Sequence, residues 1–110
     1  MTKGLVYYTD CSPTPDIFLG CQAQLKRCME QWGFPIISVS QKPIDLGQNI
    51  VVPWERSVVS MFKQILLGLE RCETDIIFMI EHDVIYHPSH FDFTPTDHER
   101  FYYNRNMWNV

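Results

Sequence analysis

The sequence predicts an α/β domain in three layers, with a mainly parallel β-sheet and helices on both of its faces. Two observations lead to this fold class. Short β-rich apolar runs alternate with longer amphipathic segments, in the order strand, helix, strand, helix, strand. The last of these runs, residues 76–80, is continuously apolar, as expected of a strand covered on both faces. This order specifies two right-handed crossover connections and hence neighbouring parallel strands.

The first part of the chain contains one strand and one helix. Residues 4–9 (GLVYYT) form a β-rich run that ends at Asp10, before a Ser-Pro-Thr-Pro stretch. Residues 16–32 are expected to be helical because apolar side chains recur there at helical spacing. Gly33 and Pro35 then supply the stop signals. We therefore expect a buried first strand followed by an amphipathic helix.

A second strand and a second helix follow. Residues 35–40 (PIISVS) form an apolar, β-branched run, and residues 41–49 are expected to form a polar loop. The second helix is expected to begin near Glu55, with Ser57 as a candidate cap. Its apolar stripe, which we expect to be buried, consists of Val58, Val59, Phe62, Ile65, Leu66 and Leu69.

The third expected strand, residues 74–80 (TDIIFMI), is followed directly by Glu81, His82 and Asp83. The remaining residues are rich in aromatic side chains, histidine and proline, and they predict no third helix. A final strand is expected around residues 101–108. Its aromatic side chains would form either a stacking surface for a sugar or base, or part of the core: Phe101, Tyr102, Tyr103 and Trp108.

Length and composition limit the classes of function. The 110 residues suffice for one domain, 1–110, and a 45% hydrophobic content excludes disorder for most of the chain. A net charge of −4 argues against a nucleic-acid partner. The longest apolar run is too short for a membrane span and no export signal is present, so a cytoplasmic protein is expected. The four cysteines form no C-x-x-C pair, which favours reduced thiols.

Polar side chains follow two of the expected strands at the points where they end. If the first strand lies between the second and the third, a crevice opens at the carboxyl ends of the first and third strands. Thr9 and Asp10 end the first strand, and Glu81 and Asp83 follow the third. Carboxylates gathered there repel one another unless a cation lies between them, and oxygen ligands favour Mg²⁺, Mn²⁺ or Ca²⁺. The alternative is that Glu81 and Asp83 end the strand in solvent.

Arg56 lies at the expected start of the second helix, where backbone N–H groups and the helix dipole favour an anion such as a diphosphate. An arginine adds a bidentate clamp for phosphate. The alternative is a surface ion pair with Glu55 or Glu99. The sequence contains neither a P-loop nor a G-x-G-x-x-G motif, which lowers the case for nucleotide sites of those kinds.

The histidines offer a competing interpretation. His82, His87 and His90 lie close together in the sequence and would suit zinc as donors. Their spacing matches no known zinc framework, and Pro88 disrupts a helix there. The favoured interpretation is a single histidine that completes a divalent-metal or phosphate site, drawn from His82, His87, His90 and His98.

The chain resembles the nucleotide-sugar-dependent glycosyltransferases of the GT-A fold, family 2-like, in which an acidic D-x-D type motif follows a hydrophobic strand. Here the motif stands as Glu81-His82-Asp83 within IIFMIEHDVIYHPSHF, the most specific part of the likeness. The likeness extends to YYTD at residues 7–10 and to residues 38–52, 55–70 and 101–108, so it covers most of the chain. It implies the Rossmann-like N-terminal half of the GT-A fold.

The resemblance implies a site for a nucleoside diphosphate-sugar, with UDP favoured, and Mn²⁺ or Mg²⁺ bridging its diphosphate. Asp83 would be the direct metal ligand, and Glu81 would reach the ribose or a metal-bound water. The nucleotide would also be contacted by Thr9, Asp10, Gln41 and Arg56. The implied activity is transfer of a hexosyl or N-acetylhexosaminyl group to an unidentified acceptor. The alternative is a non-catalytic nucleotide-binding module or subunit that needs a partner or an oligomer for activity.

Members of this family continue well beyond the acidic motif, with elements that supply an acceptor site and often a catalytic carboxylate base. This sequence ends at Val110, so we expect a minimal or truncated form. The carboxylates after the motif that are candidates for the base are Asp92, Asp97 and Glu99. An unpaired edge and apolar surface at the last strand lead us to expect a homo-oligomer that supplies the missing part.

Overall fold

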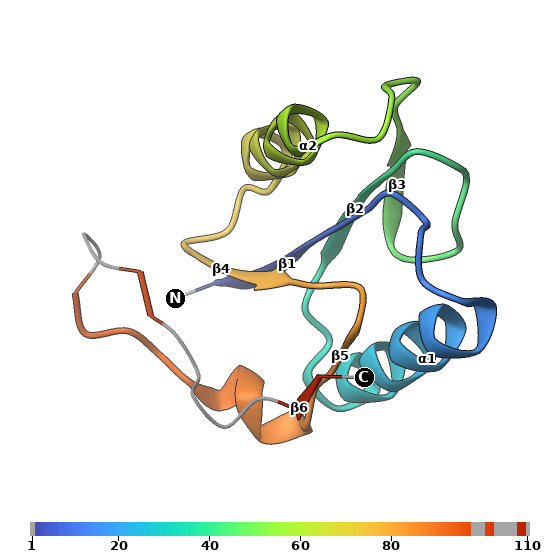
Figure 1. The fold of residues 1–110 in the computed structure, drawn as a ribbon. Helices are drawn as coiled ribbons and strands as arrows, with labels where there is room; N and C mark the ends of the chain where they lie inside the picture. Colours follow the sequence, from blue (N-terminus) through green and yellow to red (C-terminus); the bar gives the residue numbers. More distant parts are fainter. Residues whose placement is uncertain (1, 98–100, 103–107, 110) are drawn as a thin grey trace.

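The computed structural model describes residues 2–97, 101–102 and 108–109, and a four-stranded parallel sheet forms its centre (Figure 1). Its strands are β1 (Lys3–Thr9), β2 (Ile36–Ser40), β3 (Gln48–Val51) and β4 (Ile76–Ile80). The strand order is β3-β2-β1-β4, and every pairing in this sheet is parallel. The first strand therefore lies between the second and the strand that carries the acidic motif, which is the condition on which the predicted crevice depends.

Two α-helices connect the parallel strands, α1 (Pro15–Trp32) and α2 (Val58–Arg71). The sequence predicts α1 to within one residue. Gly33 ends this helix in the left-handed conformation, with a φ of 71°, and donates its N–H to the Met29 carbonyl at 2.7 Å. Ser57 caps α2 as predicted, because its Oγ accepts the Ser60 N–H at 3.0 Å. The helix itself begins at Val58 and not near Glu55.

Strand β3 replaces part of the loop that the sequence predicts. It begins with two polar residues and has only two apolar ones, Ile50 and Val51, so it is too short and mixed a run to be recognised as a strand. The position of Asn49 depends on polar contacts: its Oδ1 accepts the Ile44 N–H at 3.1 Å, and its Nδ2 donates to the Ser40 Oγ at 2.9 Å. The Asn49–Ser40 bond adds to the parallel backbone pairing of β3 with β2.

The apolar stripe of α2 faces away from the sheet, which makes the predicted burial of this stripe wrong. Its exposed members, with accessible fractions from 38% to 67%, are Val58, Val59, Phe62, Leu66 and Leu69. The buried residues of the helix are Ser60, Gln64 and Gly68. A Cβ at Gly68 would lie 2.5 Å from the Val6 Cγ1, so only glycine allows this close approach to β1. The Gln64 Nε2 donates to the carbonyls of Thr9 and Val39 at 2.9 and 3.0 Å.

The side chains of β1 divide between two sets of contacts. Leu5 and Tyr7 belong to a buried cluster that includes Leu25 and Cys28 of α1. Val6, between them in sequence, is the neighbour of Gly68 in α2. Because successive side chains of a strand point to opposite faces, each helix packs against a different set of β1 residues.

The segment after β4 contains β5 (Val84–Ile85), the short 3₁₀ helix η1 (Pro88–Asp92) and β6 (Trp108–Asn109). Strands β5 and β6 pair antiparallel in a second, small sheet. Much of the expected final strand lies outside the described residues, and Phe101 and Tyr102, which are described, are not in a strand. Both are exposed, at 90% and 43%, so they are not part of the core.

Candidate functional site

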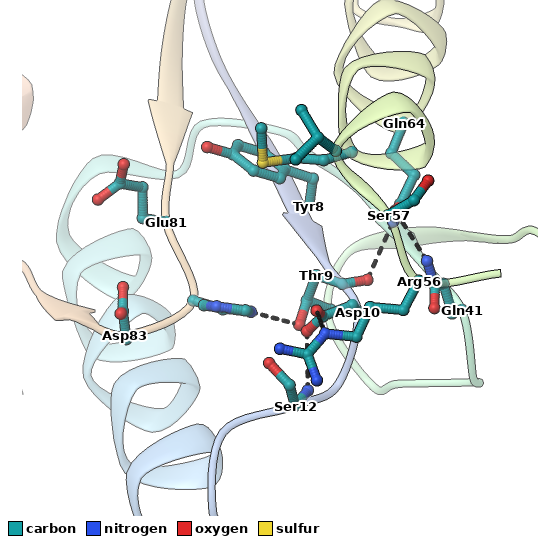
Figure 2. A pocket seen from close by; sticks show the side chains of 13 residues that line it. Tyr8, Thr9, Asp10, Ser12, Gln41, Arg56, Ser57, Gln64, Glu81 and Asp83 are labelled. Atoms are coloured by element: carbon teal, nitrogen blue, oxygen red, sulfur yellow. Dashed lines mark hydrogen bonds and ion pairs between the residues drawn. The ribbon is translucent and has the colours of Figure 1, made fainter. Parts of the chain in front are cut away.

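A cavity of about 540 Å³ lies at the carboxyl ends of β1 and β4, beside the start of α2 (Figure 2). Its volume falls within the range of about 300–1,000 Å³ that is typical of small-molecule sites. The cavity is lined by all the residues that the sequence and the family resemblance indicate as nucleotide or metal contacts: Thr9, Asp10, Gln41, Arg56, Glu81 and Asp83. The expected crevice between these two strand ends is therefore present in the fold.

Asp10 and Arg56 form an ion pair that joins the end of β1 to the segment before α2. The Arg56 Nε lies 2.7 Å from one Asp10 carboxylate oxygen, and the other oxygen accepts the Ser12 N–H at 2.9 Å. Burial alone would raise the pKa of Asp10, but the Ser12 hydrogen bonds and the Arg56 guanidinium outweigh burial and hold that pKa below its usual value. Asp10 is therefore anionic at neutral pH.

Arg56 remains accessible although it is paired. Its side chain is 72% exposed, so the guanidinium can donate to a second acceptor in the cavity. The residue directly precedes the cap of α2, and among the described residues its ion-pair partner is Asp10 and not Glu55; Glu99 lies outside the described residues. The amino end of α2 borders the same cavity through Ser57 and Val58. The positive end of a helix dipole and an arginine thus share one side of the site.

The acidic residues Glu81 and Asp83 lie on the other side of the cavity from Arg56 and Gln41 (Figure 2). The Glu81 N–H donates at 3.1 Å to the hydroxyl of Tyr86, which is buried and which fixes the backbone where β4 ends. Burial raises the pKa of Tyr86 to about 12, so this phenol stays protonated. The acidic turn is therefore attached to the core through a neutral hydroxyl.

Tyr8 lines the cavity between the two charged sides, and its placement there was not anticipated from the sequence. Burial raises the pKa of Tyr8, and the negative charges of Glu81 and Asp83 raise it further. The phenol therefore stays protonated at neutral pH and can donate a hydrogen bond. It also presents a partly buried aromatic ring to the site.

The three neighbouring histidines have three separate environments. The Nδ1 of His82 and the Oγ1 of Thr9 are hydrogen-bonded at 2.6 Å, at the edge of the cavity. The Nδ1 of His87 accepts the Ser89 N–H at the start of η1. His90 packs against the rings of Tyr86 and Phe91, and burial lowers its pKa.

Within the described part of the chain, no three His, Cys, Asp or Glu side chains are grouped so that they could hold a metal ion. Among the three of these histidines that the structure describes, His82 lines the cavity, and His87 and His90 do not. His98 lies outside the described residues. This finding applies alike to zinc and to the Mn²⁺ or Mg²⁺ expected from the sequence, so it does not distinguish between them.

Neither of the two described candidates for a catalytic base lies at the cavity. Asp92 is exposed in η1, and Asp97 lies in the segment that follows. Glu99 lies outside the described residues. No described residue is therefore assigned as a general base.

Gln64 is the main residue of the site that sequence reasoning missed. Its Nε2 ties the ends of β1 and β2 together through their carbonyls, and its Oε1 accepts from the Gln41 Nε2 at 3.3 Å. It thereby orients Gln41 at the edge of the cavity. The available signal was the recurrence of Ser60, Gln64 and Gly68 every four residues, which places small and polar side chains on one face of α2.

The described helices include none that is long and apolar enough to cross a membrane.

The cavity at the carboxyl ends of β1 and β4 brings together the polar and charged side chains described above, with an accessible arginine facing two carboxylates. Comparisons of the chain with protein-family models, with curated proteins and with solved structures found no match.

Proposed function

We propose that this domain binds a nucleoside diphosphate-sugar, with UDP as the favoured nucleotide, and transfers the sugar to an acceptor with the help of Mn²⁺ or Mg²⁺. The observation that supports this proposal is the separation of charge across the cavity. Arg56 and the amino end of α2 lie on one side, and Glu81 and Asp83 lie on the other. A diphosphate needs cationic donors and a divalent cation needs carboxylates, so a metal–diphosphate complex would use both sides.

The nucleoside is assigned to the ends of β1 and β2. Asp10, held anionic by its contacts, would accept hydrogen bonds from the N–H of a base or from ribose hydroxyls. Gln41 supplies an amide at the neighbouring strand end, and Gln64 orients it. The Thr9 hydroxyl completes this edge, next to His82.

The metal is assigned to the acidic turn. Asp83 would be a direct ligand, and Glu81 would reach the ribose or a water of the metal. Mg²⁺ is commonly held by one or two carboxylates together with substrate phosphates, and this pair of carboxylates suits that arrangement. When bound, the cation would neutralise negative charge on the departing nucleoside diphosphate. Arg56 would add positive charge from the chain to the same leaving group.

We also infer the three-layer arrangement of the Rossmann-like half of the GT-A fold, with one helix on each face of the sheet. Alternate residues of β1 support it, since Leu5 and Tyr7 share a cluster with α1 whereas Val6 contacts α2. The two crossovers run in opposite directions along the sheet, from β1 to β2 and from β3 to β4. Right-handed connections of opposite direction lie on opposite faces.

Thermal unfolding in the presence of UDP tests the donor site. With Mn²⁺ present, UDP at a hundredfold excess over its Kd should stabilise the fold by about 2.7 kcal/mol. Asp83→Asn should remove the metal-dependent part of this stabilisation while it leaves the unliganded melting temperature unchanged, because it removes a ligand charge and no core volume. Asp45→Asn is the matched control, since Asp45 is fully exposed and outside the cavity.

The outcomes separate the proposal from its alternatives. If neither UDP nor guanosine or cytidine diphosphate stabilises the chain, the cavity is not a donor site. If UDP stabilises Asp83→Asn as strongly as the parent chain, Asp83 is not a ligand. If UDP-sugars bind with metal but are neither hydrolysed nor used for transfer, the chain is a non-catalytic nucleotide-binding module.

A further inference from the structure

The outward surface of α2 is an apolar face without a covering element among the described residues. We call it the α2 face and define it by Val58, Val59, Phe62, Leu66 and Leu69. These positions fall on one side of the helix, and four of the five side chains are more than half exposed. Apolar side chains that gather on one exposed face often mark interaction surfaces.

The helix cannot turn this face toward the sheet without losing the contacts of its other side. The Gln64 Nε2 is bonded to two strand carbonyls, at 2.9 and 3.0 Å. Gly68 lets the helix backbone approach Val6 so closely that no other residue fits there. Rotation of α2 would break these bonds and bring side chains against β1. The outward direction of the apolar side chains is therefore built into the fold.

One edge of the α2 face carries two opposite charges, Lys63 and Glu70, both exposed. They are seven residues apart, about 10.5 Å along the axis, which is beyond the three- or four-residue spacing that allows pairing within a helix. The Lys63 Nζ lies 5.8 Å from the centre of the Trp54 ring, a cation–π contact that holds the ammonium at this edge. Glu70 lies two turns further along the same edge.

We propose that the α2 face is a homodimer interface, in which the α2 helices of two copies pack antiparallel about a two-fold axis. In such a pair the equivalent edges of the two helices lie side by side, and the helices run in opposite directions. Lys63 of each copy then meets Glu70 of the other, so the symmetry forms two ion pairs at once. A parallel pair would place the two equivalent edges on opposite sides of the interface, so Lys63 of one copy could not reach Glu70 of the other. The apolar side chains supply the attraction, and the charges select the direction.

The proposed interface is small. A standard interface buries about 800 Å² on each partner, more than five half-exposed side chains provide. We therefore expect a reversible dimer with a Kd on the order of micromolar. This interface differs from the oligomer expected at the last strand, since it uses a helix on the main sheet. It requires no ligand, although Val58 belongs both to the α2 face and to the lining of the cavity.

Sedimentation equilibrium over a concentration range of about 1 to 500 µM tests the interface. We expect the parent chain to dimerise and Leu66→Glu to weaken dimerisation at least tenfold. Leu19→Glu is the matched control: Leu19 is 61% exposed on α1, and its substitution should leave the Kd unchanged. Circular dichroism and thermal melts establish that each variant folds, which exposed positions should permit.

A charge exchange tests the antiparallel direction. At low ionic strength, Lys63→Glu and Glu70→Lys should each weaken the dimer by roughly two- to tenfold, and the double variant should recover the parent Kd. A parent chain that stays monomeric at 500 µM overturns the proposal. So does a dimer that Leu66→Glu and Leu19→Glu affect equally. A double variant that fails to recover the parent Kd excludes the antiparallel pairing.

Discussion

Alanine substitutions at two helical glycines would measure how tightly α2 packs on the sheet. Gly68 faces β1, where a Cβ would lie 2.5 Å from the Val6 Cγ1 and 3.5 Å from the Val39 Cγ2. Gly20 lies within α1, and a Cβ there would meet no atom within 4 Å. Replacing glycine by alanine raises helix propensity equally at the two sites. The sites differ in the space around the added methyl group.

The expected effects follow from these distances. Alanine is favoured over glycine in a helix interior by about 1 kcal/mol, so Gly20→Ala should raise the free energy of unfolding by roughly that amount. Gly68→Ala has the same gain, but it inserts a methyl group against the fully buried Val6. Overpacking of this kind costs about 1–3 kcal/mol. The difference between the two variants should therefore be about 1–3 kcal/mol in favour of Gly20→Ala.

Urea unfolding at a fixed temperature gives the two free energies directly, provided that both variants unfold with the same m-value. In thermal melts, each kcal/mol corresponds to a shift of roughly 4–8 °C for a domain of this size. If Gly68→Ala proves as stabilising as Gly20→Ala, the methyl group has found open space. The close packing of α2 on β1, and with it the outward direction of the α2 face, would then be wrong.

Two further predictions concern polar contacts at the cavity. Gln64→Leu should lower the free energy of unfolding by about 1–3 kcal/mol, because it leaves the Thr9 and Val39 carbonyls without this donor. The control is Gln31→Leu, at an exposed position. If both variants have the same effect in urea titrations, the role of Gln64 is contradicted. The folded-state pKa of Asp10 is depressed, so its contribution to stability is present above the unfolded pKa near 4 and is lost as the pH falls through the lower folded value. The urea midpoint of the parent chain should therefore fall more steeply than that of Asp10→Asn between about pH 4 and pH 2, and parallel curves would exclude the effect.

Much of the fold follows from local patterns in the sequence. The apolar runs locate β1, β2 and β4, and the helical spacing with Gly33 locates α1. The sequence leaves the position of β1 between β2 and β4 as a condition, and the observed strand order meets it and brings Asp10 and Asp83 to one cavity. The strands and the helix can be located in this way because their signals lie in residues that are close together in the sequence.

The features that sequence reasoning missed depend on contacts over long distances in the chain. Hydrophobic periodicity predicts that α2 buries its apolar stripe, but it carries no information on the closeness that Gly68 allows or on the carbonyls that Gln64 satisfies. Arg56 pairs with Asp10, which lies far from it in the sequence. The charged residues near Arg56 and those near Asp10 do not suggest this ion pair. Strand β3 pairs in parallel with β2, and the polar bonds of Asn49 add to this pairing, but only two of its four residues are apolar, which is too short a pattern to recognise.

The pairing of β1 with β4 has a consequence for the order in which the molecule forms. Leu5 pairs with Ile36 on one side and with Phe78 on the other, and Thr2 bonds to Asp75, 73 residues later in the chain. During synthesis β1 emerges first, but its second partner emerges only after both helices, so the central strand keeps an open edge until then. The acidic side of the cavity arrives on the same segment as β4. The last strand to close the sheet therefore also completes the site, and no earlier intermediate contains both walls of the cavity.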